Sequence, residues 1–280
     1  MAGPRKRMMA DLAPGSDSPL NFAVTARDKQ VMDMVAGAIR HKQVLLAFQP
    51  IMQGRDQSKV AFYEGLIRVL DETGRVIPAG VFMDTIENSD LGRELDTLAL
   101  HKGLRALHEN PHLRLSINMS ARSIGYKAWN QTLNRWLKQN ELIGERLILE
   151  ITESSAMMVP ELVVDFMDRL QMQGICFAMD DFGAGYTALR YFKDFCFDII
   201  KIDGQFIQGI AGDSDNQAMT SAMISIARNF DMLTVAEFVE NQEDADTLVR
   251  LGVDCLQGFH FGAATTRPPW LRQRELQQAV

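Results

Sequence analysis

Residues 176–185 read CFAMDDFGAG, so that four mostly apolar residues run straight into two adjacent aspartates and a glycine-rich turn. Neighbouring carboxylates repel each other, and Asp180 and Asp181 are therefore tolerated either in solvent or where a cation holds them together. The apolar run is typical of a buried strand, which places the aspartates at its end. The glycines either let the chain turn into the next helix or form a mobile loop at the mouth of a site.

The segment before this strand has the apolar period of a helix. The residues that share one helical face are Val159, Leu162, Val163, Phe166, Met167 and Leu170. Pro160 suits the first turn of this helix and Gly174 suits its end. Helices are also expected over residues 215–229 and 241–250, and this alternation with apolar strands implies a parallel sheet covered by helices.

Eight short apolar or β-branched runs are candidate strands. They cover residues 44–51, 60–69, 113–119, 146–152, 175–180, 197–203, 232–239 and 253–259. Eight strands that mostly alternate with helices predict an α/β fold, a (β/α)₈ barrel of the TIM type. The loop QGRDQSK between the first two runs is too short for a parallel crossover, so we expect a modified barrel with one antiparallel strand near the N-terminal end.

Composition and length limit the class of protein. The chain has 280 residues, of which 46% are hydrophobic and 23% charged, and its formal net charge is −7, which disfavours binding to a nucleic acid polymer. No apolar run is long enough for a membrane helix, so no membrane partner is expected. Three cysteines without close pairing fit a cytoplasmic location. We expect a flexible N-terminal tail over residues 1–25 and one barrel domain over residues 26–280.

Every candidate strand carries a polar side chain in its interior or just after its end. The set comprises Gln49, Glu64, Arg68, Asn118, Glu150, Glu153, Asp180, Asp181, Lys201, Asp203, Glu237, Glu240 and Gln257. In a barrel enzyme the carboxyl ends of the strands form one mouth, where these side chains would converge. A single carboxylate at a strand end is more often a helix cap, but its repetition over most strands of one barrel predicts a site.

Carboxylates outnumber cations in this set. Glu64, Glu150, Asp180, Asp181 and Glu237 would face only Lys201 and Arg68, and divalent metal would supply the missing positive charge. A ligand set of carboxylates and the amide of Asn118 contains only oxygen donors, which favours Mg²⁺ or Mn²⁺. These ligands are too many for one octahedral ion. Two cations that share a bridging carboxylate are therefore expected, an arrangement that recurs in phosphate-ester hydrolysis.

Eight short motifs lie in order at the strand ends. They are FQPI (48–51), YEGLIR (63–68), SINMS (116–120), LEITES (149–154), MDDFGAGYTAL (179–189), DIIKID (198–203), AEFVE (236–240) and LQGFHFG (256–262). Together they make residues 28–265 resemble the EAL-domain cyclic di-GMP phosphodiesterases. The resemblance implies a modified (β/α)₈ barrel, hydrolysis of cyclic di-GMP to linear pGpG, and assembly as a homodimer.

The resemblance also assigns metal ligands and catalytic groups. The first cation would be held by Glu64, Asn118, Glu150 and Asp180, and the second by Asp180, Asp181 and Glu237. Lys201 would orient the nucleophilic water, Glu237 would be a candidate proton acceptor, and Glu64 would belong to the catalytic set. Metal coordination would lower the pKa of that water and make hydroxide available near neutral pH.

The remaining family positions concern the substrate and the support of the site. Gln49, Leu66 and Arg68 match positions that hold the dinucleotide, and Asp203 is a weaker candidate for substrate contact. The resemblance further implies that Glu153 anchors the loop 182–190 and that Gln257 supports the metal shell.

This sequence departs from the family pattern at three places. The signature Glu-Ala-Leu is Glu-Gly-Leu at residues 64–66, Phe238 stands where glycine is usual, and the usual proline after the last motif is absent, with Ala264 nearby. Phe238 is expected to shift Glu237 or to crowd the mouth. The leading interpretation is an active phosphodiesterase. The alternatives are a weak or inactive barrel that acts as a cyclic di-GMP sensor or protein-interaction module, and a hydrolase of another phosphate ester.

Overall fold

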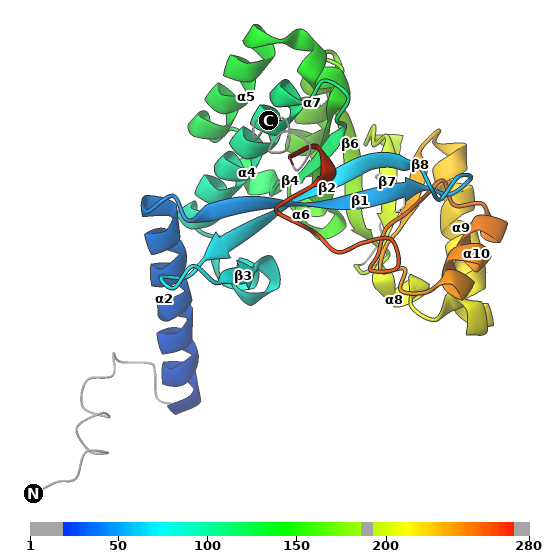
Figure 1. The fold of residues 1–280 in the computed structure, drawn as a ribbon, viewed down its shortest axis with the longest axis horizontal. Coiled ribbons are helices and arrows are strands. Elements are labelled where there is room, and N and C mark those ends of the chain that lie inside the picture. Colours follow the sequence, from blue (N-terminus) through cyan, green and yellow to red (C-terminus); the bar gives the residue numbers. More distant parts are fainter. Residues whose placement is uncertain (1–18, 186–192, 272–280) are drawn as a thin grey trace, which may run out of the picture.

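Strands covered by helices form the body of the protein, shown in Figure 1 as a computed structural model that describes residues 19–185 and 193–271. The strands are β1 (Val44–Gln53), β2 (Val60–Leu70), β3 (Val76–Pro78), β4 (Leu115–Asn118), β5 (Leu147–Thr152), β6 (Cys176–Phe182), β7 (Ile199–Ile202), β8 (Leu233–Ala236) and β9 (Cys255–Leu256). The α-helices are α2 (Pro19–Arg40), α3 (Met83–Ile86), α4 (Asp90–Glu109), α5 (Lys127–Gln139), α6 (Glu153–Met158), α7 (Pro160–Gln171), α8 (Gly204–Ile207), α9 (Ser214–Asn229) and α10 (Gln242–Leu251).

The sheet closes into a barrel with one reversed strand. Its order is β1-β9-β8-β7-β6-β5-β4-β2-β3, and β1 also pairs with β2, so that β3 lies outside the ring on β2. β1 runs antiparallel to both of its neighbours, β2 and β9, whereas the pairs from β2 through β4 to β9 are parallel. The predicted α/β fold, a modified (β/α)₈ barrel with one antiparallel strand near the N-terminal end, is therefore confirmed.

Tight polar turns explain the antiparallel strands. In the connection from β1 to β2, Asp56 accepts a hydrogen bond from the backbone N–H of Ser58, which stabilises a local turn instead of a crossover. β3 was not predicted, because three residues are too few to show an alternating pattern. It forms because Asp71 accepts hydrogen bonds from the backbone N–H groups of Thr73 and Arg75, which turns the chain back onto β2.

The predicted helix before β6 is confirmed, with a narrower buried face than its apolar pattern indicates. α7 begins at Pro160, and Gly174 beyond its end has a φ of 82°. Val163, Phe166, Met167 and Leu170 are buried, whereas Val159 and Leu162 are exposed. The helix thus covers the barrel with the face that carries Val163 and Phe166, whereas Leu162 and the preceding Val159 leave apolar surface in solvent.

The N-terminal boundary differs from the predicted one. α2 begins at Pro19, so residues 19–25, which we expected in the tail, are helical, and residues 1–18 lie outside the described part of the chain. Proline is favoured in the first turn of a helix, and a helix once nucleated propagates readily, which explains the early start. Val35 and Ala38, in the second half of α2, are buried in a small core beside β1 and β2, and Figure 1 shows the first half extending away from the barrel.

Inside the barrel, an apolar layer lies directly below a polar one. The apolar layer consists of Ile51, Phe62, Ile148, Ala178, Ile199, Val235 and Cys255. Strand side chains alternate between faces, so the residues two positions further toward the mouth also point inward. Those residues are Gln49, Glu64, Glu150, Asp180, Lys201, Glu237 and Gln257. The apolar layer therefore closes the floor of a polar chamber at the carboxyl ends of the parallel strands.

None of the described helices combines the length and the apolar character that crossing a bilayer would require.

Two glycine substitutions test the packing of this fold far from the chamber. A Cβ atom at Gly144, which precedes β5, would lie 2.1 Å from the carbonyl oxygen of Gln173. Gly144→Ala is therefore expected to lower the free energy of unfolding by about 1–3 kcal/mol. At Gly37, inside α2, a Cβ atom would have no neighbour within 4 Å. Gly37→Ala is therefore expected to raise the free energy of unfolding by about 0.5–1 kcal/mol. Urea denaturation measures both changes, and equal stabilities of the two variants would contradict the described packing.

Candidate active site

Lys201 is the centre of the polar chamber and is only 1% exposed. Its ammonium nitrogen lies 2.8 Å from Asp180 Oδ1 and 2.9 Å from Glu150 Oε2. It lies 2.8 Å from Glu237 Oε1 and 3.6 Å from Glu64 Oε2. The predicted carboxylates of β2, β5, β6 and the end of β8 therefore converge on one buried cation.

Two amides hold Glu64 in this cluster. Asn118 donates a hydrogen bond of 2.7 Å to one carboxylate oxygen of Glu64, and Gln257 donates one of 2.6 Å to the other. Burial alone would raise the pKa of Glu64, but the charge of Lys201 and these two amide donors outweigh it and hold that pKa below its usual value. Glu64 is thus kept as a carboxylate, and Gln257 is one of the two side chains that hold it in place.

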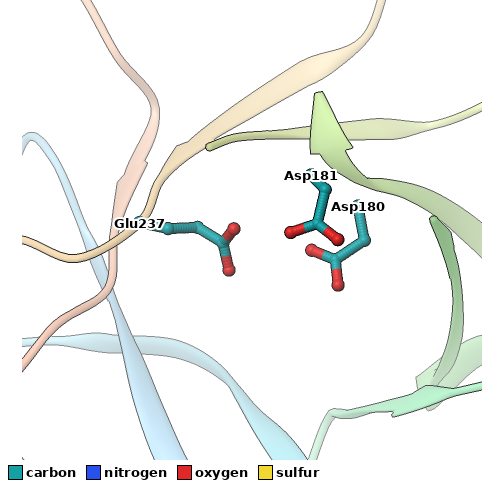
Figure 2. Close-up of side chains that lie close together, drawn as sticks. All are labelled: Asp180, Asp181 and Glu237. Atoms are coloured by element: carbon teal, nitrogen blue, oxygen red, sulfur yellow. The ribbon is translucent and has the colours of Figure 1, made fainter. Parts of the chain in front are cut away.

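Asp180, Asp181 and Glu237 form a second group of carboxylates. Each offers a carboxylate oxygen such that the three atoms lie within 4.8 Å of one another, and Figure 2 shows the side chains facing a common space. Asp181 has a φ of 54°, in the left-handed region, which turns its side chain toward Asp180 instead of to the opposite face of the strand. Burial and the charge of Asp180 raise the pKa of Asp181 to about 6.

The charge balance of the chamber calls for a further cation. Burial and the charge of Glu64 raise the pKa of Glu150 to about 8, and burial raises the pKa of Glu237 well above its usual value. Glu150 Oε1 is buried and has no hydrogen-bond partner among the described residues. The carboxylates of Asp180, Asp181 and Glu237 and the unpartnered oxygen of Glu150 offer oxygen ligands, which suit a hard divalent cation. The residues present therefore fit divalent metal at this site.

The predicted substrate residues fall into two pairs. Gln49 and Leu66 line the hollow of about 270 Å³ above the carboxylates, and Gln49 donates a hydrogen bond to the carbonyl of Gly262. Arg68 and Asp203 instead have local protein partners. Arg68 donates to the carbonyl of the preceding residue in β2, and Asp203 accepts from the backbone N–H of Gln205 at the start of α8.

Glu153, the first residue of α6, contacts the turn that follows β6. It is 2% exposed, and one of its carboxylate oxygens accepts a hydrogen bond of 3.0 Å from the backbone N–H of Gly183. Residues 186–190 of the predicted loop 182–190 lie outside the described residues. Within the described residues Glu153 therefore bonds to the first turn of this loop, and its anchoring role stays a prediction.

Aromatic and acidic residues outside the predicted ligand and substrate set also border the site. Phe238 and Phe259 line the hollow of about 270 Å³, and Asp96 lines a second hollow of about 260 Å³ that shares Glu64 and Asp180 with the first. Phe259 lies in the last motif, and Phe238 is the departure from the family pattern that we expected to shift Glu237 or to crowd the mouth. Asp96 belongs to helix α4, so no pattern of strand ends indicated it.

Comparison with known proteins gives consistent matches. The EAL domain family model matches residues 32–264. The chain is 29% identical over 249 residues to cyclic di-GMP phosphodiesterase PdeB of Shewanella oneidensis, covering 88% of this chain and 29% of that protein. It is 30% identical over 236 residues to cyclic di-GMP phosphodiesterase PdeF of Escherichia coli, covering 83% of this chain and 31% of that protein. The chain thus spans about a third of the length of these curated relatives.

A solved structure gives a similar result. The fold matches that of the PaMucR phosphodiesterase in complex with c-di-GMP with a TM-score of 0.77 and 28% sequence identity. The match covers 84% of this chain and 97% of that structure.

Replacing Lys201 tests the charge balance. In Lys201→Met the buried carboxylates lose their ammonium partner, and the free energy of unfolding in chelator at pH 7.5 is expected to fall by about 3–5 kcal/mol. The loss should shrink toward pH 5.5, because carboxylates with a raised pKa keep their protons in the fold and destabilise it only as they ionise at higher pH. Mg²⁺ or Mn²⁺ should restore part of the stability by binding the folded state. Stability equal to that of the wild type in chelator would contradict this charge balance.

Asp96 provides an independent pH test. Burial raises its pKa from 3.8 to about 6, although Ser123 Oγ and the backbone N–H of Ser120 donate to its carboxylate. Between these pH values the unfolded chain ionises first, so this residue lowers stability as the pH rises, by up to about 3 kcal/mol. Asp96→Asn keeps an acceptor for both donors but does not ionise. It is expected to match the wild type at pH 4 and to exceed it in stability at pH 7.5, as measured by urea denaturation. A difference that is constant with pH would contradict this assignment.

Proposed function

The chain belongs to the EAL domain family, and on this premise we propose that it is a metal-dependent phosphodiesterase that hydrolyses cyclic di-GMP to linear pGpG. The observation that carries the proposal is the cluster of carboxylates around buried Lys201, next to a hollow of about 270 Å³. Such an oxygen-rich chamber at the carboxyl ends of barrel strands suits the chemistry of a phosphate ester better than that of an uncharged substrate.

Two divalent cations, Mg²⁺ or Mn²⁺, are part of the proposal. Glu64, Asn118, Glu150 and Asp180 would hold one of them, and Asp180, Asp181 and Glu237 would hold the other. Bound there, they would supply a nucleophilic hydroxide near neutral pH and neutralise charge on the phosphate. The unpartnered oxygen of Glu150 and the shared space of the second group support this assignment.

The side chains of the chamber supply the remaining chemistry. Lys201, held by ion pairs to Asp180 and Glu150, would donate a hydrogen bond that orients the attacking water. Glu237 lies 2.8 Å from the ammonium nitrogen of Lys201, and its ionised carboxylate would accept the proton of that water. The water oxygen would bond to phosphorus as one P–O ester bond breaks, which leaves a phosphate monoester and a hydroxyl group.

The surroundings of the chamber support a dinucleotide substrate. Two hollows of about 270 and 260 Å³ meet at Glu64 and Asp180, so a ligand with two bulky ends would place its centre over the carboxylates. Gln49, Leu66 and Arg68 are proposed to hold it, with Asp203 as a further contact. The names of PdeB and PdeF and the ligand of the PaMucR complex support cyclic di-GMP as that substrate.

A second candidate function is binding of cyclic di-GMP without turnover, as a sensor or interaction module. One observation favours it, namely that Phe238 occupies a wall of the hollow beside Glu237 in a left-handed conformation. The retention of every proposed ligand favours turnover. A homodimer and a cytoplasmic location are also parts of the leading proposal, as the family resemblance and the cysteine pattern lead us to expect.

Removal of a proposed ligand is the direct test. Asp180→Ala and Glu64→Ala are each expected to lower kcat by more than about a hundredfold, because each removes a ligand and an ion-pair partner from the chamber. The assay follows pGpG by chromatography with Mg²⁺, with Mn²⁺ and with chelator. Asp165→Ala, which alters an exposed aspartate of α7, is the control and should leave the rate unchanged.

The outcomes separate the candidates. Metal-dependent pGpG formation that is lost in both ligand variants supports the phosphodiesterase. Wild-type turnover in Asp180→Ala would overturn the ligand assignment. Binding of cyclic di-GMP by the wild type without any product would favour the sensor.

A further inference from the structure

Phe238 has an unusual combination of conformation and position. Its φ is 54°, it is 52% exposed, and it lines the hollow above the carboxylates. We propose that the ring of Phe238, seated on Gly204, is an aromatic wall of the substrate site against which a purine base of the ligand packs. This inference rests on the proposed function and adds to it a residue that determines affinity.

Phe238 has a left-handed backbone conformation that its surroundings must stabilise. The non-glycine residues with positive φ in the described part of the chain are Lys42, Asp181, Asp231 and Phe238. The left-handed region is costly for a bulky residue, whereas aspartate tolerates it more easily. A phenylalanine therefore persists there only if its surroundings compensate for the strain.

Gly204 provides the compensating contact. A Cβ atom at Gly204 would lie 2.5 Å from Cδ2, 2.7 Å from Cγ and 3.0 Å from Cβ of Phe238, so the ring rests on a surface that only glycine offers. Gly204 is buried at the start of α8, directly after Asp203, whose carboxylate caps that helix. Gly204, the seat of the ring, thus belongs to a helix, and its contact with Phe238 determines the orientation of the ring.

The ring of Phe238 lines a hollow that suits a flat apolar group. Phe238 directly follows Glu237, which is bound to Lys201, and it lines the same hollow as Leu66 and Phe259, the latter 71% exposed. Exposed aromatic rings beside a phosphate-binding centre suit stacking of nucleobases, which is tolerant of sequence because every base has a π face. A purine offers the larger face of the two base classes, so a guanine of the proposed substrate fits this wall.

A simpler account is that the ring only fills space. In that case its removal would leave substrate affinity unchanged and would affect stability alone. The two accounts differ in the separation of KM from kcat, which the following variants measure.

The primary variant is Phe238→Gly, which removes the ring while glycine adopts the left-handed conformation without strain. KM for cyclic di-GMP with Mg²⁺, and Kd measured by calorimetry in chelator, are each expected to rise about tenfold, the size typical of one lost base–aromatic contact. The value of kcat should change by less than about threefold, because the loss concerns binding that is uniform over the reaction. Phe238→Tyr, which keeps an aromatic face, should recover the affinity that Phe238→Gly loses.

A second variant tests the seat. Gly204→Ala should displace the ring and raise KM in the wild-type background, but it should have little further effect in Phe238→Gly, where no ring remains to be displaced. Lys42→Gly is the matched control, because it relieves another left-handed residue without touching the hollow, and its KM should equal that of the wild type.

The results distinguish this inference from the proposed function. If the wild type neither binds nor hydrolyses cyclic di-GMP, both fail together. If the wild type is active and Phe238→Gly keeps its KM and Kd, only the aromatic wall is overturned. An increase in kcat at constant KM would also overturn it, because the ring would then hinder turnover instead of contributing to binding. Equal effects of Gly204→Ala in the two backgrounds would overturn the seat.

Discussion

The buried ammonium group of Lys201 forms ion pairs that connect β7 to β5, to β6 and to the end of β8 across the chamber. The side chain of Lys201 is only 1% exposed, and a charged group so deeply buried is tolerated only with close partners. Its partners are themselves buried carboxylates, which in turn need a cation. Asp180, Glu150 and Glu237 come from β6, β5 and the end of β8. The register of these strands relative to β7 is thus fixed by charge as well as by backbone pairing, because a slip of one residue would point Lys201 away from them.

Closure of the barrel completes this arrangement. β1 pairs with β2 on one side and β9 on the other, and its antiparallel course brings Gln49 to the level of the chamber from the opposite direction to the parallel strands. Gln257, at the end of β9, donates to Gln49 and to Glu64, which links both sides of this junction. The apolar layer one step below excludes water from the floor, so these charges and dipoles act in a medium of low dielectric constant.

Two left-handed residues directly follow carboxylates that contact Lys201. Asp181 follows Asp180 and Phe238 follows Glu237, and both have a φ of 54°. Asp181 lies inside β6, at a shift of the pairing register between Met179 and Phe182, and Phe238 lies two residues beyond the end of β8. Each left-handed residue thus interrupts the regular strand geometry directly after a carboxylate that points into the barrel. Aspartate tolerates this conformation, whereas Phe238 requires the seat that Gly204 provides. The strained backbone at Asp181 and Phe238 therefore occurs directly beside carboxylates of the chamber.

Strand period and strand ends are local patterns, so the amino-acid sequence was enough to predict the eight strands of the barrel and most of its inward-facing polar residues. Arg68 and Asp203 were predicted with them but bond to neighbouring residues instead. The sequence did not predict β3, which has three residues, or the start of α2 at Pro19. Tertiary structure alone decided that Asp96 of α4 borders the site, and that Gly204 carries the ring of Phe238. The physical reason is that these contacts join segments that are distant in the sequence, and no local pattern of apolar and polar residues records which distant surface a side chain will meet.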